Sequence, residues 1–491
     1  MQDRDEFLDA RRLREAGKLP EAEGAYQRLL QRFPRSDSIL NALAEVSLSL
    51  RKFDASIELL GRSLRLKPDQ PIALMLLGLA LREVARTDAA LECLDRAIAL
   101  RPGYATALFH RAQLLQAVKR FDDAIASFDR AIEAKPDYAA ALVGRGQLLA
   151  DLNRYDEALA SCERAIAAKP GYTEAHYVKA ELLLLRGDFE QGWELYERRW
   201  DTKARSGGRQ FARCPLWSGE PIAGKTLLIH PEVGLGDFVM FSRFFPLIGP
   251  LGAKVVVHSP PALAALLASS FDGVTVIPKG NPVPPVDVQC PIMSLPRAFK
   301  MAPETIPAGV PYLRTAPQTQ ARWLEALGQR GRLARIGLVW SGKADRAIDR
   351  SPLKNRSLPL ALLAPWLQLP FEFHSLQREI LPDDADTLAA LGRIKDHRSE
   401  LDDFSDTAAL AGEMDLVISI DTSVAHVAGA LGKKLWVLLP YSSDYRWPRG
   451  NGSTPWYPTA TLFRQNLPGD WPEVVARVTD CLSDFANGIS S

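Results

Sequence analysis

Two patterns of apolar and polar residues divide the chain. Up to about residue 206 the apolar residues recur at helical spacing, and prolines stand 34 residues apart at Pro34, Pro68, Pro102, Pro136 and Pro170. Beyond about residue 225 the pattern changes to short continuous apolar runs separated by helical or loop stretches. Such runs are typical of strands buried on both faces, and their alternation with helices predicts parallel sheets. The sequence therefore predicts an α-solenoid followed by an α/β region.

A 34-residue period that ends in proline is the signature of the tetratricopeptide repeat. The segment 120–136 resembles the repeat at Phe121, Ala124, Phe128, Ala131 and Pro136. Five repeats are clear, and a sixth at 187–200 has Gly192 and Arg199 where alanines are usual and no closing proline. We expect this sixth repeat to dock on the next domain of the chain.

The repeats predict a superhelix over residues 1–206. A solenoid presents a long curved surface, and its usual role is to hold a peptide or protein, so an acceptor or partner protein is expected there. A purely structural or dimerising arm is the alternative. Residues 207–224 are rich in Gly, Pro and basic residues without an apolar period, which predicts a linker.

The first α/β half, residues 225–315, has four predicted strands at Thr226–His230, Lys254–His258, Val274–Ile277 and Val286–Cys290. A glycine-containing loop at 230–237 follows the first strand. It lacks the third glycine of a dinucleotide fingerprint and the Lys-Ser/Thr pair of a P-loop, so both of those nucleotide sites are excluded.

The second half, residues 316–491, has predicted strands at Arg335–Trp340, Phe371–Ser375, Asp415–Ile420, Leu435–Leu439 and Ala460–Phe463. Asp421, Thr422 and Ser423 follow a buried strand and precede helical apolar spacing. Open α/β sheets bind ligands at the carboxyl ends of strands, and a helix N-terminus offers N–H groups to a phosphate or diphosphate. His426 lies one turn after Thr422 on the same face. An ordinary, well-capped strand–helix unit is the alternative reading of this local pattern.

The loop at 341–357 is polar and basic, with cations at Lys343, Arg346, Arg350, Lys354 and Arg356. Fixed cations at the carboxyl end of a strand suit a diphosphate leaving group, whose growing charge they stabilise. A solvated loop is the alternative. Gln377 ends the next strand in the segment Ser-Leu-Gln and is expected to contact the nucleotide base.

Two motifs resemble those of the heptosyltransferase-type GT-B glycosyltransferases of glycosyltransferase family nine. The string DTSVAHVAGALG at 421–432 is similar to their nucleotide-sugar site, and GLGD at 234–237 is similar to their loop with a cleft-facing aspartate. The resemblance implies two Rossmann-like parallel-sheet halves, with the acceptor on 225–315 and the nucleotide-sugar on 316–491. It also implies that a final helix at about 472–486 crosses back to the first half.

The resemblance implies that Asp237 takes the proton of the acceptor hydroxyl, as inverting glycosyl transfer requires. Capping of the following helix is the alternative for Asp237, and His230 or Glu232 could replace it as base. The implied donor-binding residues are Gly236, Ser341, Lys354, Arg356, Gln377, Asp421, Thr422, Ser423 and His426. No metal and no cofactor are implied, and Asp384-Ala385-Asp386 is expected to be a solvated helix cap.

Composition narrows the setting. With 60 basic and 59 acidic residues the net charge is +1, which argues against a general nucleic-acid binder. Five scattered cysteines fit neither a zinc site nor a disulfide framework and predict a reducing cytoplasm. The charged N-terminus predicts no signal peptide, and no apolar run reaches membrane-spanning length.

Repeats joined to a transferase resemble the architecture of the protein O-GlcNAc transferases and of bacterial protein O-glycosyltransferases. The first hypothesis is an inverting, metal-independent glycosyltransferase that moves a sugar from a nucleotide-sugar to a protein held by residues 1–206. Flagellin Ser/Thr residues are one candidate acceptor. Transfer to a surface polysaccharide or lipid-linked glycan is a second hypothesis, and a non-catalytic repeat scaffold is a third.

Overall fold

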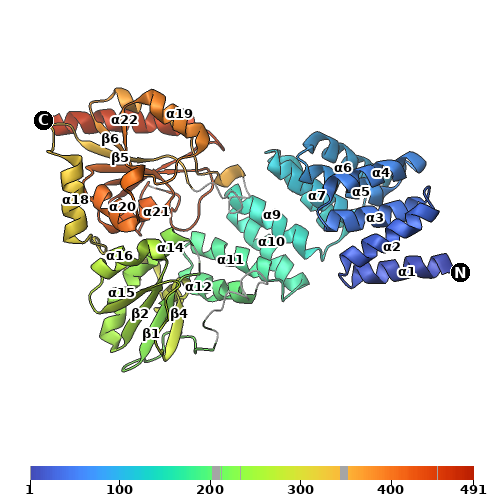
Figure 1. Ribbon diagram of the computed structural model, residues 1–491, viewed down its shortest axis with the longest axis horizontal. Coiled ribbons are helices and arrows are strands. Elements are labelled where there is room, and N and C mark those ends of the chain that lie inside the picture. The colour runs from blue at the N-terminus through green and yellow to red at the C-terminus, as the bar shows by residue number, and fades with distance from the viewer. Residues whose placement is uncertain are drawn as a thin grey trace. The chain divides into compact units, whose positions relative to one another are not determined.

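The computed structural model describes residues 2–201, 211, 213–232, 234–342, 352–450 and 452–490 (Figure 1). The chain forms two compact units. The first comprises Met1–Leu149 with Asp156–Ala175, and the second comprises Ala150–Tyr155 with His176–Ser491. Within the described residues, no helix combines the length and the apolar character needed to span a bilayer.

The first unit is built from antiparallel helix pairs. Its helices are α1 (Gln2–Glu15), α2 (Leu19–Arg32), α3 (Asp37–Ser49), α4 (Phe53–Leu66), α5 (Pro71–Glu83), α6 (Thr87–Leu100), α7 (Ala105–Ala117), α8 (Phe121–Ala134), and most of α9 (Ala139–Asp151) and α10 (Tyr155–Ala168). Small residues let the paired helices approach closely. A Cβ on Gly78 would lie 3.0 Å from Leu94 Cγ, and one on Gly146 would lie 3.1 Å from Cys162 Sγ. The predicted solenoid of paired helices is confirmed.

The sixth repeat belongs to the second unit. After α11 (Thr173–Leu185), helix α12 (Phe189–Tyr196) and the 3₁₀ turn η1 (Glu197–Asp201) close the repeats. Phe189 and Trp193 are buried in the same hydrophobic core as the α/β residues later in the chain. Gly192 permits this packing because its Cβ would lie 2.7 Å from Leu184 Cδ2. The expected docking of this repeat is confirmed, and the division between units therefore lies before residue 206.

Two parallel sheets form the rest of the second unit. The first has the order β3-β2-β1-β4, with β1 (Thr226–His230), β2 (Lys254–Ser259), β3 (Val274–Pro278) and β4 (Val288–Pro291). The second has the order β10-β9-β8-β5-β6-β7, with β5 (Arg335–Val339), β6 (Glu372–Ser375), β7 (Ile394–Asp396), β8 (Leu416–Ile420), β9 (Leu435–Leu439) and β10 (Ala460–Arg464). Two parallel-sheet halves are expected from the sequence. The three-residue strand β7 is not expected, because its exposed Lys395 and Asp396 interrupt any apolar run.

Helices connect and cover the strands (Figure 1). They are α14 (Leu235–Phe241), α15 (Phe245–Ile248), α16 (Pro261–Ser270), α17 (Leu295–Ala298), α18 (Pro317–Leu327), α19 (Pro382–Leu391), α20 (Phe404–Gly412), α21 (Ser423–Ala430) and α22 (Trp471–Ser490). Between the two halves, α14 packs against α21 and α16 packs against α20.

The strand order reverses beside the first strand of each sheet. In the first sheet β1 lies between β2 and β4, and in the second β5 lies between β6 and β8. Open α/β sheets bind ligands outside the carboxyl ends of strands at such reversals. The topology therefore selects the ends of β5 and β8 as a site, where Ser341 and Asp421 follow the two strands.

The closing helix α22 corrects one expectation. Trp366 Nε1 donates to the Val475 carbonyl at 3.3 Å, and the Phe485 ring packs on Phe371 and Trp436. These partners belong to the second half, so in the described residues α22 covers the sheet of its own half instead of crossing to the first.

Candidate functional site: the helix ends between the two α/β halves

The first turn of α14 and the first turn of α21 lie in direct contact. A Cβ on Gly236 would lie 2.8 Å from His426 Cδ2 and 3.4 Å from Ser423 Cα. Real Cβ atoms essentially never come within 3.0 Å of another heavy atom, so only glycine fits at this position without displacing a neighbour. Gly236 from the first half and Ser423 and His426 from the second are thus brought together, although 187 residues separate Gly236 from Ser423 in the chain.

The amino end of α21 is built as the sequence suggested. Thr422 is the N-cap with extended backbone, and its side chain makes no capping bond to the helix. Its hydroxyl lies 3.2 Å from Ser419 Oγ. Asp421, Thr422 and Ser423 are all partly exposed, and the N–H groups of a first helical turn have no partner within the helix, as an anion site requires.

Arg356 and the turn after β5 complete this end of the site. Arg356 Nη1 donates to the Asp421 carbonyl at 3.1 Å and lies 3.5 Å from Asp421 Oδ2. A Cβ on Gly342 would lie 4.0 Å from Thr422 Cγ2, which places the Ser341–Gly342 turn beside the N-cap. The structure therefore gathers Ser341, Arg356 and Thr422 at the strand reversal. Lys343, Arg346 and Arg350 lie outside the described residues.

Gln377 has a different place from the one expected. Its Oε1 accepts from the Trp340 and Ser341 N–H groups at 2.6 and 2.9 Å. Its Nε2 donates to Ser341 Oγ at 3.0 Å and to the Glu379 carbonyl at 3.1 Å. These four bonds use the full capacity of the amide. The expected contact of this side chain with a nucleotide base is therefore corrected, because Gln377 holds the turn at Ser341.

Lys354 is also placed away from the site. Its Nζ lies 3.0 Å from Asp151 Oδ1, at the end of α9. Burial lowers the pKa of Lys354, but the carboxylates of Asp151 and Glu181 raise it more, and the net pKa lies above its usual value. The ammonium therefore remains charged and pairs with repeat residues, which corrects its expected place at a diphosphate.

His426 is buried beneath the N-cap. Its Nδ1 lies 2.9 Å from Tyr457 Oη, its Nε2 lies 3.8 Å from Asp421 Oδ1, and its ring stacks on Trp447. Burial, with help from the Arg446 charge, lowers the pKa of His426 to about 3. The imidazole is neutral at pH 7 and is a fixed polar group beside the amino end of α21.

Asp237 stands in the first turn of α14 and forms an ion pair with Arg446. Burial raises the pKa of Asp237, and Arg446 opposes that rise only in part. A buried carboxylate with a raised pKa is a stronger base than an exposed one. The sequence did not identify Arg446, which lies in the loop between β9 and β10.

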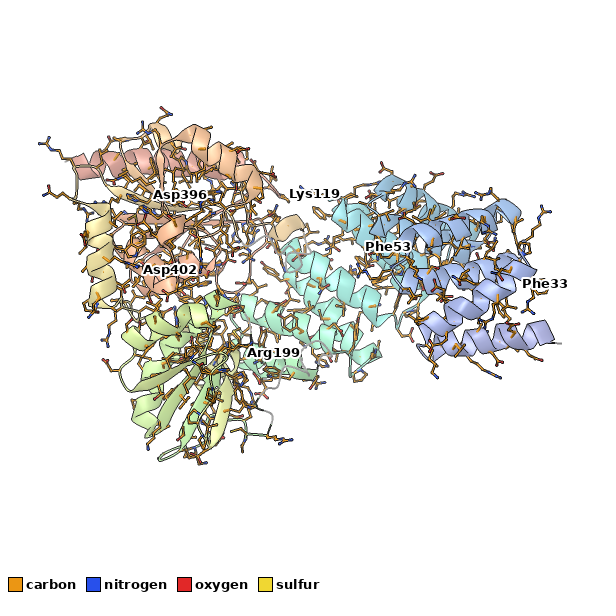
Figure 2. The ribbon with its side chains drawn as sticks, viewed as in Figure 1. Phe33, Phe53, Lys119, Arg199, Asp396 and Asp402 are labelled. Carbon is orange, nitrogen blue, oxygen red and sulfur yellow. The ribbon has the colours of Figure 1, made fainter. Side chains whose placement is uncertain are left out.

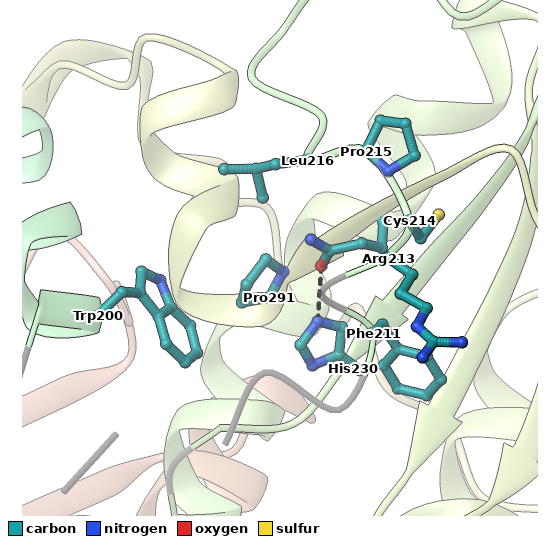
Figure 3. Close-up of a pocket in the computed structure, with 9 residues that line it drawn as sticks. Trp200, Phe211, Arg213, Cys214, Pro215, Leu216, His230 and Pro291 are labelled. Carbon is teal, nitrogen blue, oxygen red and sulfur yellow. Dashed lines mark hydrogen bonds between the residues drawn. The ribbon is translucent and has the colours of Figure 1, made fainter. Parts of the chain in front are cut away.

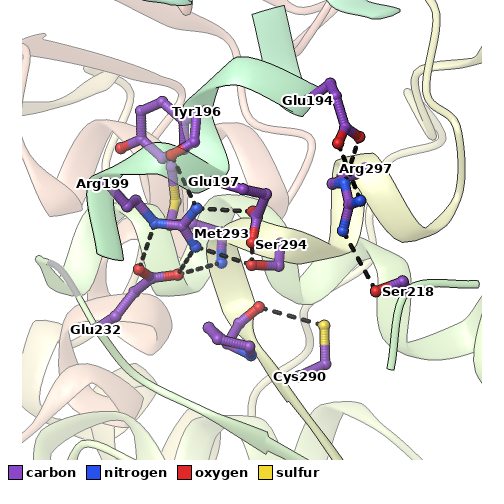
Figure 4. Close-up of polar contacts among 11 residues, drawn as sticks. Glu194, Tyr196, Glu197, Arg199, Ser218, Glu232, Cys290, Met293, Ser294 and Arg297 are labelled. Atoms are coloured by element: carbon purple, nitrogen blue, oxygen red, sulfur yellow. Dashed lines mark hydrogen bonds and ion pairs between the residues drawn. The ribbon is translucent and has the colours of Figure 1, made fainter. Parts of the chain in front are cut away.

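The two alternative bases on the same loop are engaged elsewhere. Arg199 Nε and Nη2 each donate to the Glu232 carboxylate at 2.7 Å, and the Met293 N–H donates to it at 3.1 Å (Figure 4). His230 Nε2 lies 2.7 Å from Gln289 Oε1. Glu232 and His230 therefore serve as structural partners in this arrangement, and Asp237 is the carboxylate that stands in the helix turn packed against α21.

A cavity of about 260 Å³ opens beside His230 at the strand reversal of the first sheet (Figure 3). Its lining residues are Trp200, Phe211, Arg213, Cys214, Pro215, Leu216, His230, Gln289 and Pro291. It therefore lies beyond the His230–Gln289 pair and is separate from the contact between Gly236 and His426.

The expectation that Asp384 is a solvated helix cap is also corrected. It is buried, and its two carboxylate oxygens accept from Trp340 Nε1 at 3.1 Å and from the Leu360 N–H at 3.3 Å. The residue is therefore an internal acceptor and not a solvated cap.

Comparison with known proteins supports the prediction of tetratricopeptide repeats in the first part of the chain. Models of the tetratricopeptide repeat match residues 7–71, 41–105, 75–139, 111–173 and 149–204. Residues 7–204 are tetratricopeptide repeats. Protein FlbA of Caulobacter vibrioides is 28% identical over 341 residues, which cover 63% of this chain and 55% of that protein. The chain thus spans about half the length of this curated relative.

Solved repeat proteins are similar to part of the chain. A crystal structure of MamA is 25% identical, covers 33% of this chain and 94% of its own, and has a TM-score of 0.31. YrrB, described as a tetratricopeptide-repeat protein with an unusual peptide-binding site, is 21% identical, covers 35% of this chain and 90% of its own, and has a TM-score of 0.30. TTC0263 of Thermus thermophilus, a thermophilic tetratricopeptide-repeat protein, is 22% identical, covers 37% of this chain and 99% of its own, and has a TM-score of 0.33.

Proposed function

We propose that this chain is an inverting, metal-independent glycosyltransferase with a GT-B fold in its α/β part. It moves a sugar from a nucleotide-sugar to a protein acceptor recruited by the repeats. The observation that carries the proposal is the contact of Gly236 with His426 and Ser423, which joins the first turn of α14, where the partly buried Asp237 stands, to the amino end of α21 in the other half.

Each end of this arrangement has a chemical task. The donor diphosphate lies at the amino end of α21, where N–H groups and the hydroxyls of Thr422 and Ser423 bind it. Asp237 takes the proton of the acceptor hydroxyl as the oxygen attacks the anomeric carbon. The bond to the nucleoside diphosphate breaks at the same time, and Arg356 stabilises the charge that develops on this leaving group. Neutral His426 keeps a polar group beside the sugar without adding charge.

The acceptor is the less defined partner. A repeat superhelix holds peptides or proteins, and a protein acceptor such as flagellin fits a transferase attached to one. A surface polysaccharide or lipid-linked glycan is the alternative acceptor. The full chain carrying Asp237→Asn is expected to bind its acceptor without turning it over. Identifying the captured molecule as a protein or as a glycan distinguishes the two acceptors.

A non-catalytic scaffold is the second candidate function. The ion pair between Arg446 and Asp237 favours it, because a paired carboxylate is a weaker base. The two candidates differ in whether an activated sugar binds, so the decisive experiment measures that binding directly.

The test is the thermal stability of the full chain with UDP-, CMP-, GDP- and other nucleotide-sugars. All ten tryptophans lie at or beyond residue 193, so their fluorescence reports on the second unit. A ligand at about 100 times its Kd stabilises a fold by about 2.7 kcal/mol, which raises Tm by several degrees. A rise with one nucleotide supports the transferase, and no rise with any supports the scaffold. Asp237→Asn is expected to keep the rise and abolish transfer.

A further inference from the structure

Arg446 of the second half binds Asp237 of the first half, and no sequence motif predicted this contact. It lies in the loop between β9 and β10, and its side chain is 13% exposed. Nη2 donates to Asp237 Oδ1 and Nη1 donates to Asp444 Oδ2. Its guanidinium also lies 4.8 Å from the centre of the Tyr445 ring. Two ion pairs and one ring contact therefore hold this side chain.

The ion pair leaves half of the Asp237 carboxylate open. Oδ1 is bound to Arg446, whereas Oδ2 has no hydrogen-bond partner among the described residues. A carboxylate held by one oxygen has a fixed orientation, and its other oxygen can accept a proton from an incoming hydroxyl.

Arg446 also affects the charge of Asp237. Burial and the neighbouring carboxylates of Asp444 and Asp421 favour the protonated form of Asp237, and Arg446 is the cation that opposes them. A protonated Asp237 cannot act as a base. The arginine therefore favours the ionised form that the proposed reaction requires.

The last repeat helix holds both partners of this ion pair in place. The Trp193 ring of α12 packs edge-on against Tyr445 at 5.3 Å and against Phe241 of α14 at 5.7 Å. Phe189 of α12 stacks on Trp456, in the same loop as Arg446, at 6.0 Å. One repeat helix thus touches the loop that carries Arg446 and the helix that carries Asp237.

We propose that Arg446, seated by the repeat helix α12, is the positioning residue that orients Asp237 and keeps it available as a base. The proposal deepens the proposed function and rests on it. It makes the sixth repeat part of the site, because Trp193 and Phe189 of α12 pack on Tyr445 and Trp456 in the loop that carries Arg446.

The first experiment measures the carboxyl group itself and needs no substrate. The full chain is labelled with γ-¹³C aspartate, and the Asp237 signal is assigned by its loss in Asp237→Asn. We expect the Asp237 signal to titrate about one pH unit or more higher in Arg446→Gln than in the unaltered chain. Arg449→Gln is the matched control, since Arg449 is an exposed arginine of the same loop that binds the Tyr441 carbonyl at 2.6 Å. Equal titration of Asp237 in Arg446→Gln and the unaltered chain overturns the proposal.

The second experiment uses the nucleotide-sugar that stabilises the full chain. Arg446→Gln should lower kcat about tenfold or more while the donor Kd stays unchanged, and Arg446→Lys should restore part of kcat. A changed donor Kd with an unchanged kcat overturns the proposal, because Arg446 would then act on the donor. If the unaltered chain transfers no sugar, the proposed function fails, and the titration still decides whether Arg446 controls Asp237.

Discussion

Gly236 and Gly429 each lie against an aromatic ring of the proposed donor site. A Cβ on Gly429 would lie 2.4 Å from Tyr457 Cδ1, and one on Gly236 would lie 2.8 Å from His426 Cδ2. Tyr457 in turn bonds His426 through its hydroxyl. The position of the His426 ring therefore depends on two residues that have no side chain.

Gly236→Ala tests this dependence. The added methyl must push the His426 ring or α14 aside, so we expect at least a tenfold weaker affinity for the donor with the fold preserved. Affinity is measured by calorimetric titration with the stabilising nucleotide-sugar. Gly234→Ala is the control, since its Cβ meets only Asp237 Oδ2 at 3.6 Å and its φ of −63° suits alanine. An unchanged affinity in Gly236→Ala would show that the ring has room to move.

The buried His374–His397 pair predicts that the second half is sensitive to acid. His374 Nδ1 lies 3.0 Å from His397 Nε2, and the surrounding charged groups are Glu372, Lys395, Arg335, Asp396 and Glu400. Burial, with the neighbouring His397, lowers the pKa of His374 to about 4. Below pH 6.5 the unfolded chain binds a proton that the folded chain excludes until about pH 4, so stability falls across that window by up to about 1.4 kcal/mol per pH unit.

Urea unfolding followed by tryptophan fluorescence between pH 7.5 and 5 measures this loss. His374→Gln removes the titrating ring, so its free energy of unfolding should fall less steeply with pH than that of the unaltered chain. The variant is compared with itself across the pH range, because the substitution also lowers stability at every pH. Parallel curves for the two proteins would exclude His374 as the source of the acid sensitivity.

At the scale of elements, the turns between paired helices repeat a left-handed residue every 34 positions. The residues with positive φ are Gly17, Arg51, Ala85, Lys119, Asn153 and Gly187. Only the first and last are glycines, so the other four carry a Cβ in a conformation that costs roughly 1 kcal/mol. The repeat therefore stores a small strain at each of these inner turns.

Lys119→Gly is expected to relieve the backbone strain at one of these inner turns. Lys119 is exposed, has a φ of 63° and is labelled in Figure 2. The variant should raise the stability of the first unit by about 0.5 kcal/mol, since part of the relief is offset by the greater freedom of glycine in the unfolded chain. Hydrogen exchange of amides in α7 and α8 reads this change locally. Lys119→Ala is the control, and an equal gain there would trace the effect to the lysine side chain.

Elements that depend on local pattern were predictable, and long-range partners were not. The short apolar runs located nine of the ten strands, and Asp421 to Ser423 located the helix end at the strand reversal. By contrast, Arg446 meets Asp237 across 209 residues, and Lys354 meets Asp151 from a distant helix. A basic residue in a loop does not reveal which carboxylate will neutralise it, so Lys354 was assigned to a phosphate and Arg446 was overlooked.

For the molecule as a whole, the sixth repeat belongs to the core of the α/β unit. Arg199 is fully buried and binds Glu232, Glu197 and Ser294 (Figure 4). Burial lowers the pKa of this guanidinium, but the two glutamates raise it well above its usual value, so the cation is permanent. Removing one member of a buried ion pair costs about 3–5 kcal/mol, because the other charge remains without a partner.

Two truncations test where the independent unit begins. Residues 139–491 keep α9 to α12, and residues 202–491 lack Phe189, Trp193 and Arg199, so Glu232 loses its partner and the faces of Phe241 and Trp456 are uncovered. We expect the longer fragment to unfold cooperatively near the transition of the full chain and to retain nucleotide-sugar binding. The shorter fragment should aggregate or lack a cooperative transition. Thermal unfolding by tryptophan fluorescence compares them, and a shorter fragment with the same Tm and the same donor affinity would contradict the placement of α12 in the core.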